Sequence, residues 1–142
     1  ISDGASALVL TSESNLNGRE PMARIVAHTT HSIHPSEFTL APIGAIEKLL
    51  GKTGWTADSV DLFEINEAFA MVTMLTMQAL NLSHDKVNIY GGACAQGHPI
   101  GSTGSRLIVT LAHALQQHGK QRGIAALCIG GGEATAVALE RA

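Results

Sequence analysis

The segment 91–106, GGACAQGHPIGSTGSR, places His98 between Gly97 and Pro99, with no charged side chain before Arg106. Glycines let a ligand approach the backbone closely, and the start of a following helix offers unpaired N–H groups. A histidine in this setting can transfer a proton to or from a nucleophile. The residues alone leave an equal alternative, in which His98 is a polar turn residue before a helix.

Cys128 and the glycines that follow it, in AALCIGGG, form a second candidate for chemistry. A cysteine in apolar surroundings is most often a small buried hydrophobic residue. Its place at the end of a predicted strand also fits a thiol that carries a proton. Gly130 and its two successors either form a tight connection or direct N–H groups toward a developing oxyanion. Neither segment matches a phosphate-binding loop, a dinucleotide fingerprint or a serine-hydrolase elbow.

A metal site is suggested by His28, His31 and His34, which recur at intervals of three. In an extended segment this spacing sends His28 and His31 to opposite faces, so we expect no metal there. Met71, Met74 and Met77 recur within a predicted helix, and we expect them to fill the core.

The elements that would position these residues alternate between strands and helices, which predicts an α/β fold. Asn66 is expected to cap the second helix, with an acid in its first turn. Pro42 fits the first turn of the first helix, and Gly51 or Gly54 its end. In chain order we predict strands at 5–11 and about Ile25 and Val26, a helix at 40–54, a strand at 61–65, a helix at 66–82, a strand at 86–90, a helix at 104–119, and strands at 123–130 and 135–140.

The composition limits the classes of partner. The 142 residues are 45% hydrophobic and 15% charged, against about 25% charged in an average domain, which predicts apolar surface for a protein partner. The net charge of −3 argues against nucleic acid, and no apolar run is long enough to span a membrane. Two cysteines form no disulfide framework, which predicts a cytoplasmic protein, with a mitochondrial or peroxisomal location as alternatives.

Three motifs together resemble the C-terminal half of the thiolase family: NEAFA at 66–70, the segment 91–106 and CIGGG at 128–132. The residues of these motifs are most similar to those of acetyl-CoA acetyltransferases, also called acetoacetyl-CoA thiolases. The resemblance implies a mixed sheet with helices on both faces, one half of a layered αβαβα fold. It also implies that residues 1–20 end the N-terminal thiolase half and that 21–142 form the C-terminal domain.

The resemblance assigns a role to each motif. His98 would deprotonate a nucleophilic cysteine, and Cys128 would carry the α-proton of acetyl-CoA. Asn66 would hold a water that forms one oxyanion hole with His98, and the N–H of Gly130 would contribute to a second. The resemblance also implies three substrate-binding residues: Ala68 and Phe69 beside the pantetheine of CoA, and Phe38 near the acyl group.

The implied function is the reversible Claisen condensation of two acetyl-CoA molecules to acetoacetyl-CoA and CoA, which requires no metal or redox cofactor. Its alternatives are a 3-ketoacyl-CoA thiolase for longer chains and a non-catalytic acyl-CoA-binding or assembly module. The family's acylated cysteine lies in an N-terminal half, and neither Cys94 nor Cys128 matches it. We therefore expect the isolated chain to be inactive, and its partners to be that half and further copies in a homodimer or homotetramer. Because the sequence begins with Ile1, we expect it to be part of a longer protein.

Overall fold

A computed structural model describes residues 2–142, which build a four-stranded mixed sheet in the order β1-β4-β3-β2. Strand β1 pairs antiparallel with β4, β4 antiparallel with β3, and β3 parallel with β2. The elements in chain order are η1 (Glu13–Asn15), β1 (Ala23–Ser32), η2 (Pro35–Leu40), α1 (Ala41–Thr53), η3 (Ala57–Ser59), β2 (Leu62–Ile65), α2 (Ala70–Leu80), η4 (His84–Lys86), α3 (Ala93–Gln96), α4 (Ile100–Gln117), β3 (Arg122–Ile129) and β4 (Glu133–Arg141), where η denotes a short 3-10 helix.

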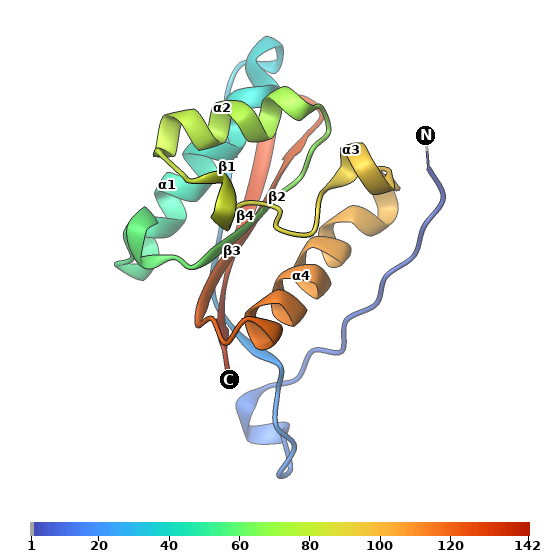
Figure 1. Cartoon of the computed structure of the whole chain (residues 1–142), viewed down its shortest axis with the longest axis vertical. Coiled ribbons are helices and arrows are strands. Elements are labelled where there is room, and N and C mark those ends of the chain that lie inside the picture. The colour runs from blue at the N-terminus through green and yellow to red at the C-terminus, as the bar shows by residue number, and fades with distance from the viewer. Residues whose placement is uncertain (1) are drawn as a thin grey trace.

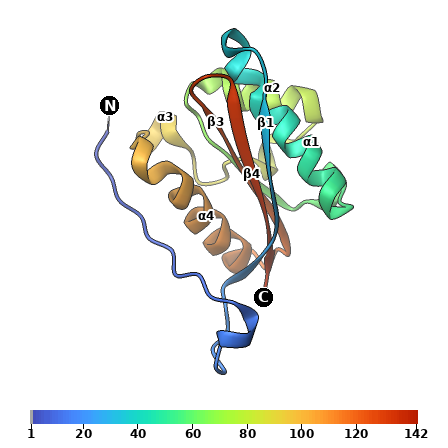
Figure 2. The same ribbon diagram turned by 180° about the vertical axis from the view of Figure 1, so that it is seen from behind.

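Helices cover both faces of the sheet (Figures 1 and 2). Alternating side chains of the strands enter two separate apolar clusters. Phe63 and Ile65 of β2 pack with α1 in one cluster, whereas Leu62 packs with Leu107 and Leu111 of α4 in the other. The predicted α/β class, with a mixed sheet between helices, is confirmed.

Helix α1 illustrates why the predicted helices form. Pro42 lies in its first turn, where its missing N–H costs nothing, and Gly54 ends it with a left-handed φ of 71°. Its buried residues Ala45, Ile46 and Leu49 lie on one face, as the helical period predicts. The strands predicted at 61–65, 123–130 and 135–140 are also confirmed, as is the strand about Ile25. Helix α4 begins at Ile100, before its predicted start.

The strand predicted at residues 5–11 is wrong. This segment is extended but belongs to no ladder, and it runs along the outer side of α4 (Figure 1). Ser6 accounts for its attachment, because the Ser6 hydroxyl contacts Ser102 Oγ at 2.8 Å and Ser102 O at 2.9 Å. Val9 is 98% exposed. Apolar composition predicted burial, but a strand also needs a neighbouring strand, and none among residues 2–142 lies beside it.

Asn66 is not the cap of a helix, contrary to the prediction. Its backbone N–H donates to Ala126 O at 2.9 Å and so continues the β2–β3 ladder by one residue. Helix α2 begins only at Ala70, with Phe69 at the N-cap position and no side-chain cap. The Asn66 side chain therefore caps no helix.

The predicted strand at 86–90 is reduced to one parallel bridge between Val87 and Phe63. Lys86 belongs to η4, and Asn88 has a left-handed φ of 48°, which turns the chain out of an extended path. The expectation that the methionines of α2 fill the core is wrong for two of them. Met71 is 51% and Met74 66% exposed, and only Met77 packs against the core, because α2 buries its Val72, Thr73 and Thr76 side.

The histidines of β1 lie as predicted. His28 is exposed, whereas the ring of His31 packs against Gly44 of α1, where a β-carbon would clash with it. Residues 2–142 hold no group of three or more histidine, cysteine, aspartate or glutamate side chains arranged to bind a metal. Over the same residues, no helix combines the length and apolar character needed to cross a bilayer.

Candidate active site

Two of the candidate residues follow parallel strands that end at the same edge of the sheet. Strands β2 and β3 run parallel, with Ile65 opposite Ala126. Asn66 follows Ile65, and Cys128 lies two residues beyond Ala126. Both residues therefore lie at the carboxyl edge of the β2–β3 pair, where α/β sheets usually bind ligands. The glycine turn between β3 and β4 extends from the same edge.

The α3–α4 loop brings His98 to this edge. His98 Nε2 lies 3.4 Å from Nδ2 of Asn66, although the two residues are 32 positions apart in the sequence. On the other side of the ring, Nδ1 lies 2.6 Å from Oγ1 of Thr103. The backbone N–H of His98 donates to Ser2 Oγ at 3.1 Å. Both ring nitrogens and the backbone N–H of His98 therefore have partners, which is more than a polar turn residue requires.

Asn66 has one polar atom without a partner. The residue is 1% exposed, and its Oδ1 is buried with no hydrogen bond among residues 2–142. A buried acceptor without a partner is costly, and such atoms are commonly satisfied by ordered water. Oδ1 is therefore the atom of Asn66 that an ordered water would satisfy.

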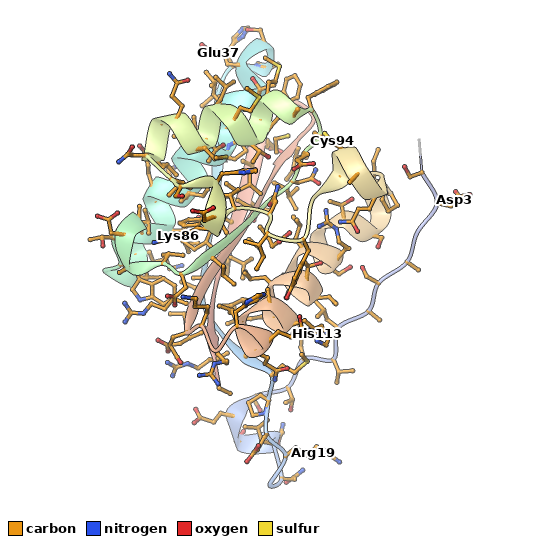
Figure 3. The ribbon with its side chains drawn as sticks, viewed as in Figure 1. Asp3, Arg19, Glu37, Lys86, Cys94 and His113 are labelled. Atoms are coloured by element: carbon orange, nitrogen blue, oxygen red, sulfur yellow. The ribbon has the colours of Figure 1, made fainter. Side chains whose placement is uncertain are left out.

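A second set of contacts fixes the loop that carries Asn66. The Asn88 side chain forms a pair of bonds with the Ile65 backbone, accepting from N–H at 2.8 Å and donating to C=O at 2.9 Å. Glu67 accepts from Asn88 Nδ2 and from the Cys94 N–H, both at 2.9 Å. Figure 3 shows Cys94 on α3 beside the β2–α2 loop. Burial acts to raise the pKa of Glu67, but these bonds outweigh it and lower the pKa below its ordinary value.

Cys128 is a free, buried thiol. Burial raises the pKa of Cys128 above its ordinary value of 9.0, and a backbone hydrogen bond offsets part of the effect. Removal of a thiolate from water is costly, so the neutral thiol is the resting form at physiological pH. A buried neutral thiol at the sheet edge is suited to donate a proton to a carbanion and to take it back.

The glycine turn between β3 and β4 has an unusual backbone. Gly131 and Gly132 have φ values of 92° and 90°, which residues with a side chain rarely adopt. Gly132 O accepts the Ile33 N–H at 2.9 Å, and a β-carbon on Gly132 would clash with the Ile33 carbonyl. Gly130 is exposed and has open space where a β-carbon would lie. The hydrogen bond to Ile33 therefore fixes the turn at Gly132, whereas Gly130 stays exposed.

The predicted substrate-binding residues form a second group. The rings of Phe38 and Phe69 pack edge to face, with centroids 6.1 Å apart and an interplanar angle of 66°. Ala68 is half-buried beside Phe69. The structure thus joins Asn66 to His98, and Phe38 to Phe69. No hydrogen bond within residues 2–142 links the Cys128 thiol to the His98 ring.

Several residues that shape the site were not predicted. Glu64 forms a buried ion pair with Arg106 at 3.4 Å, which connects β2 to α4. Glu64 could have been found as a charged residue inside an apolar strand. Thr103 could have been found because a helical threonine commonly donates to the carbonyl four residues earlier, which here belongs to Pro99. Sequence spacing gives no sign of the remaining contacts, because they join distant segments. The unpredicted residues are Ser2, Glu64, Asn88, Thr103 and Arg106, together with the bonds of Glu67.

Comparison with known proteins gives a consistent result. Residues 19–141 match the family model described as thiolase, C-terminal domain. The chain is 47% identical over 143 aligned positions to cytosolic acetyl-CoA acetyltransferase of Mus musculus, covering 99% of this chain and 36% of that protein. It is 45% identical to acetyl-CoA acetyltransferase of Schizosaccharomyces pombe, again covering 36% of the relative. The chain therefore spans about a third of the length of these relatives.

Solved structures agree with the sequence comparison. The acetyl-CoA acetyltransferase of Bacillus anthracis superposes on 92% of this chain and 34% of its own, with a TM-score of 0.90 and 41% identity. Human mitochondrial 3-ketoacyl-CoA thiolase has a TM-score of 0.89 and 37% identity, with the same coverage of both chains. The chain belongs to the thiolase family, whose C-terminal domain it matches over nearly its whole length.

Proposed function

We propose that this chain carries the C-terminal catalytic residues of an acetyl-CoA C-acetyltransferase, which interconverts two acetyl-CoA with acetoacetyl-CoA and CoA. The observation that carries the proposal is the placement of Asn66 and Cys128 at one sheet edge, with His98 in contact with Asn66. The identity of 47% to an acetyl-CoA acetyltransferase supports this choice of substrate.

In the proposed acylation step, His98 acts as the general base. Its Nε2 takes the proton of a nucleophilic cysteine thiol, which the N-terminal thiolase half supplies. The thiolate attacks the thioester carbonyl carbon, the bond between that carbon and the CoA sulfur breaks, and CoA leaves with the proton of the Cys128 thiol, so that Cys128 becomes a thiolate while His98 stays protonated. The product is an acyl-enzyme and free CoA.

Cys128 acts in the carbon–carbon step. In thiolysis the nucleophilic thiolate attacks the 3-keto carbon of acetoacetyl-CoA, and the bond between C2 and C3 breaks. The enolate of acetyl-CoA that leaves takes its proton from the Cys128 thiol. Condensation is the reverse: the Cys128 thiolate formed in the acylation step removes that proton, and His98 returns its own proton to the nucleophilic cysteine as the product leaves. The raised pKa of Cys128 favours the thiol and so favours proton donation at physiological pH.

Preorganised donors would stabilise the two oxyanions. A water on Asn66, together with His98, would face the enolate oxygen of the thioester. The accessible N–H of Gly130 would face the tetrahedral intermediate on the nucleophile. Phe69 and Ala68 would lie beside pantetheine, and Phe38 beside the acyl group. These roles need only side chains, backbone and the thioester, with no metal or redox cofactor.

A longer-chain 3-ketoacyl-CoA thiolase is the second candidate, favoured by the TM-score of 0.89 to the human mitochondrial enzyme. A non-catalytic acyl-CoA-binding module is the third. We also propose that the N-terminal half and further copies, in a dimer or tetramer, cover the exposed apolar side chains. A cytoplasmic location is proposed from the cytosolic relative.

The test supplies the chain with a thiolase N-terminal half, fused or coexpressed, and measures thiolysis of acetoacetyl-CoA and of a series of longer 3-ketoacyl-CoA substrates. Preference for acetoacetyl-CoA would support the proposal, and preference for long chains would select the second candidate. Acyl-CoA binding without turnover would select the binding module.

Two variants of the reconstituted protein test the division of roles. His98→Ala should slow acylation by about 10²–10⁴-fold, the usual contribution of a general base. Cys128→Ser should still become acylated but lose condensation. Acyl-enzyme formation is followed by mass spectrometry after mixing with acetyl-CoA. Equal acylation of the wild type and His98→Ala would contradict the role of His98.

A further inference from the structure

The contact between His98 and Thr103 has a consequence for the protonation of the ring. Thr103 is 2% exposed, and its Oγ1 lies 2.6 Å from His98 Nδ1. The same hydroxyl donates to Pro99 O at 3.1 Å. Pro99 precedes Thr103 by four positions, and a helical threonine commonly donates to the carbonyl at that spacing.

A hydroxyl has one hydrogen, so the bond to Pro99 O leaves Thr103 only lone pairs to offer the ring. In that arrangement Nδ1 carries the proton and donates a hydrogen bond to Thr103 Oγ1. A neutral imidazole has one N–H, and Nε2 is therefore unprotonated. This agrees with the other contact, since Asn66 Nδ2 is a donor and lies 3.4 Å from Nε2.

One competing arrangement exists for these groups. Thr103 could donate to Nδ1, and the Asn66 amide could turn over to accept an Nε2–H on Oδ1, which has no partner. That arrangement would direct a proton instead of a lone pair at the site, and His98 could not act as a base there. Thr103 thus decides between an active and an inactive tautomer of His98.

We infer that Thr103 is a positioning residue, whose hydroxyl holds neutral His98 in the Nδ1–H form and leaves Nε2 as the proton acceptor. The contacts of both ring nitrogens support this tautomer, and its catalytic importance rests on the function proposed above. After Nε2 takes a proton, Thr103 still accepts from Nδ1–H, so one contact serves both charge states of the ring.

The experiment measures the tautomer directly, by ¹⁵N NMR of the 142-residue chain labelled at histidine, at alkaline pH where imidazole is neutral. We expect His98 to show a protonated Nδ1 and an unprotonated Nε2, opposite to the usual preference of free histidine. An Nε2–H tautomer in the wild-type chain would overturn the inference without any variant, and it would leave thiolase activity to be judged separately.

Three variants then identify the cause. Thr103→Val, which removes the hydroxyl at nearly constant volume, should shift His98 mainly to the Nε2–H form, and Thr103→Ser should restore Nδ1–H. Thr76→Val is the matched control, because Thr76 is a fully buried helical threonine that donates to Val72 O at 2.8 Å. It should leave the His98 signals unchanged. An unchanged tautomer in Thr103→Val would refute the role of the hydroxyl.

A kinetic readout follows in the protein reconstituted with the N-terminal half. Thr103→Val should slow acylation at least about 10-fold, a part of the 10²–10⁴ that a general base contributes, with KM for the acyl-CoA little changed. Thr103→Ser should recover most of the rate. A rise in KM at constant kcat would show a role in substrate binding and contradict positioning.

Discussion

At the scale of single residues, the ion pair of Glu64 and Arg106 connects β2, which Asn66 directly follows, to α4, which carries Thr103. Glu64 lies two positions before Asn66 on β2, and Arg106 lies three after Thr103 on α4. The side chains are 2% and 15% exposed, and burial raises the pKa of Glu64 to about 7 despite the attraction of Arg106. Removing one member leaves the other charge buried without compensation, so the pair fixes the relative position of β2 and α4.

The raised pKa of Glu64 predicts a pH dependence of stability. Because the folded-state pKa exceeds the ordinary value of 4.5, the folded state favours the protonated form. The associated stabilisation is complete below pH 4.5 and is lost as pH rises through about 7, an effect of about 3 kcal/mol in the free energy of unfolding. Glu64→Gln should remove this dependence in urea titrations between those pH values.

Glu47→Gln is the matched control for this prediction, because Glu47 is exposed on α1. It should retain the wild-type decline in the free energy of unfolding. The lowered pKa values of Asp61 and Glu67 act below their ordinary values and leave this window unaffected. A Glu64→Gln variant with the same decline as the wild type would show that another group causes it.

At the scale of elements, the β3–β4 turn links the candidate site to the segment that carries Phe38. Gly132 O accepts the Ile33 N–H, and Ile33 lies two residues before the short helix η2, which holds Phe38. Phe38 in turn packs on Phe69 at the start of α2. The turn therefore couples three loops at one end of the sheet, and it requires a backbone that glycine adopts without strain.

The three glycines of the turn allow strain and steric clash to be separated. Gly130→Ala should leave the free energy of unfolding nearly unchanged, since Gly130 has open space and no left-handed φ. Gly131→Ala adds only the strained φ and should cost about 1–3 kcal/mol. Gly132→Ala adds a clash with the Ile33 carbonyl and should cost more. Urea denaturation measures all three, and equal losses for Gly131→Ala and Gly132→Ala would show that the carbonyl moves freely.

The elements also show what the sequence could predict. Local signals suffice for α1, where Pro42 and Gly54 mark the ends, and for β3, whose apolar run is buried. The two wrong strand predictions depend on features outside the local sequence pattern. Residues 5–11 have the composition of a strand but no neighbouring strand, and Asn88 leaves the extended conformation with a φ of 48°. The motifs were sufficient to identify the candidate residues. The hydrogen bond between Thr103 and His98, which fixes the tautomer of His98, depends instead on how the α3–α4 loop folds.

At the scale of the whole molecule, apolar side chains remain outside the two cores. Phe69, Met71 and Met74 are all more than half exposed along the start of α2, and Ile100 and Ile129 are exposed elsewhere. Figure 1 shows α2 in front of α1, with no element of the described chain drawn over it. Apolar patches exposed on a protein surface commonly mark sites that contact another protein.

The exposed start of α2 predicts that the 142-residue chain associates with itself when no other partner covers it. Sedimentation velocity over a concentration series should show reversible association that persists at high salt, because burial of apolar surface drives it and charge screening does not weaken it. Substituting both Met71→Gln and Met74→Gln should weaken the association at least about tenfold, which corresponds to about 1.4 kcal/mol. Met22→Gln, at an exposed methionine outside α2, should leave it unchanged. A chain that stays monomeric at every concentration would mean that the methionines of α2 tolerate water, and that the cover proposed for them is unnecessary for this domain.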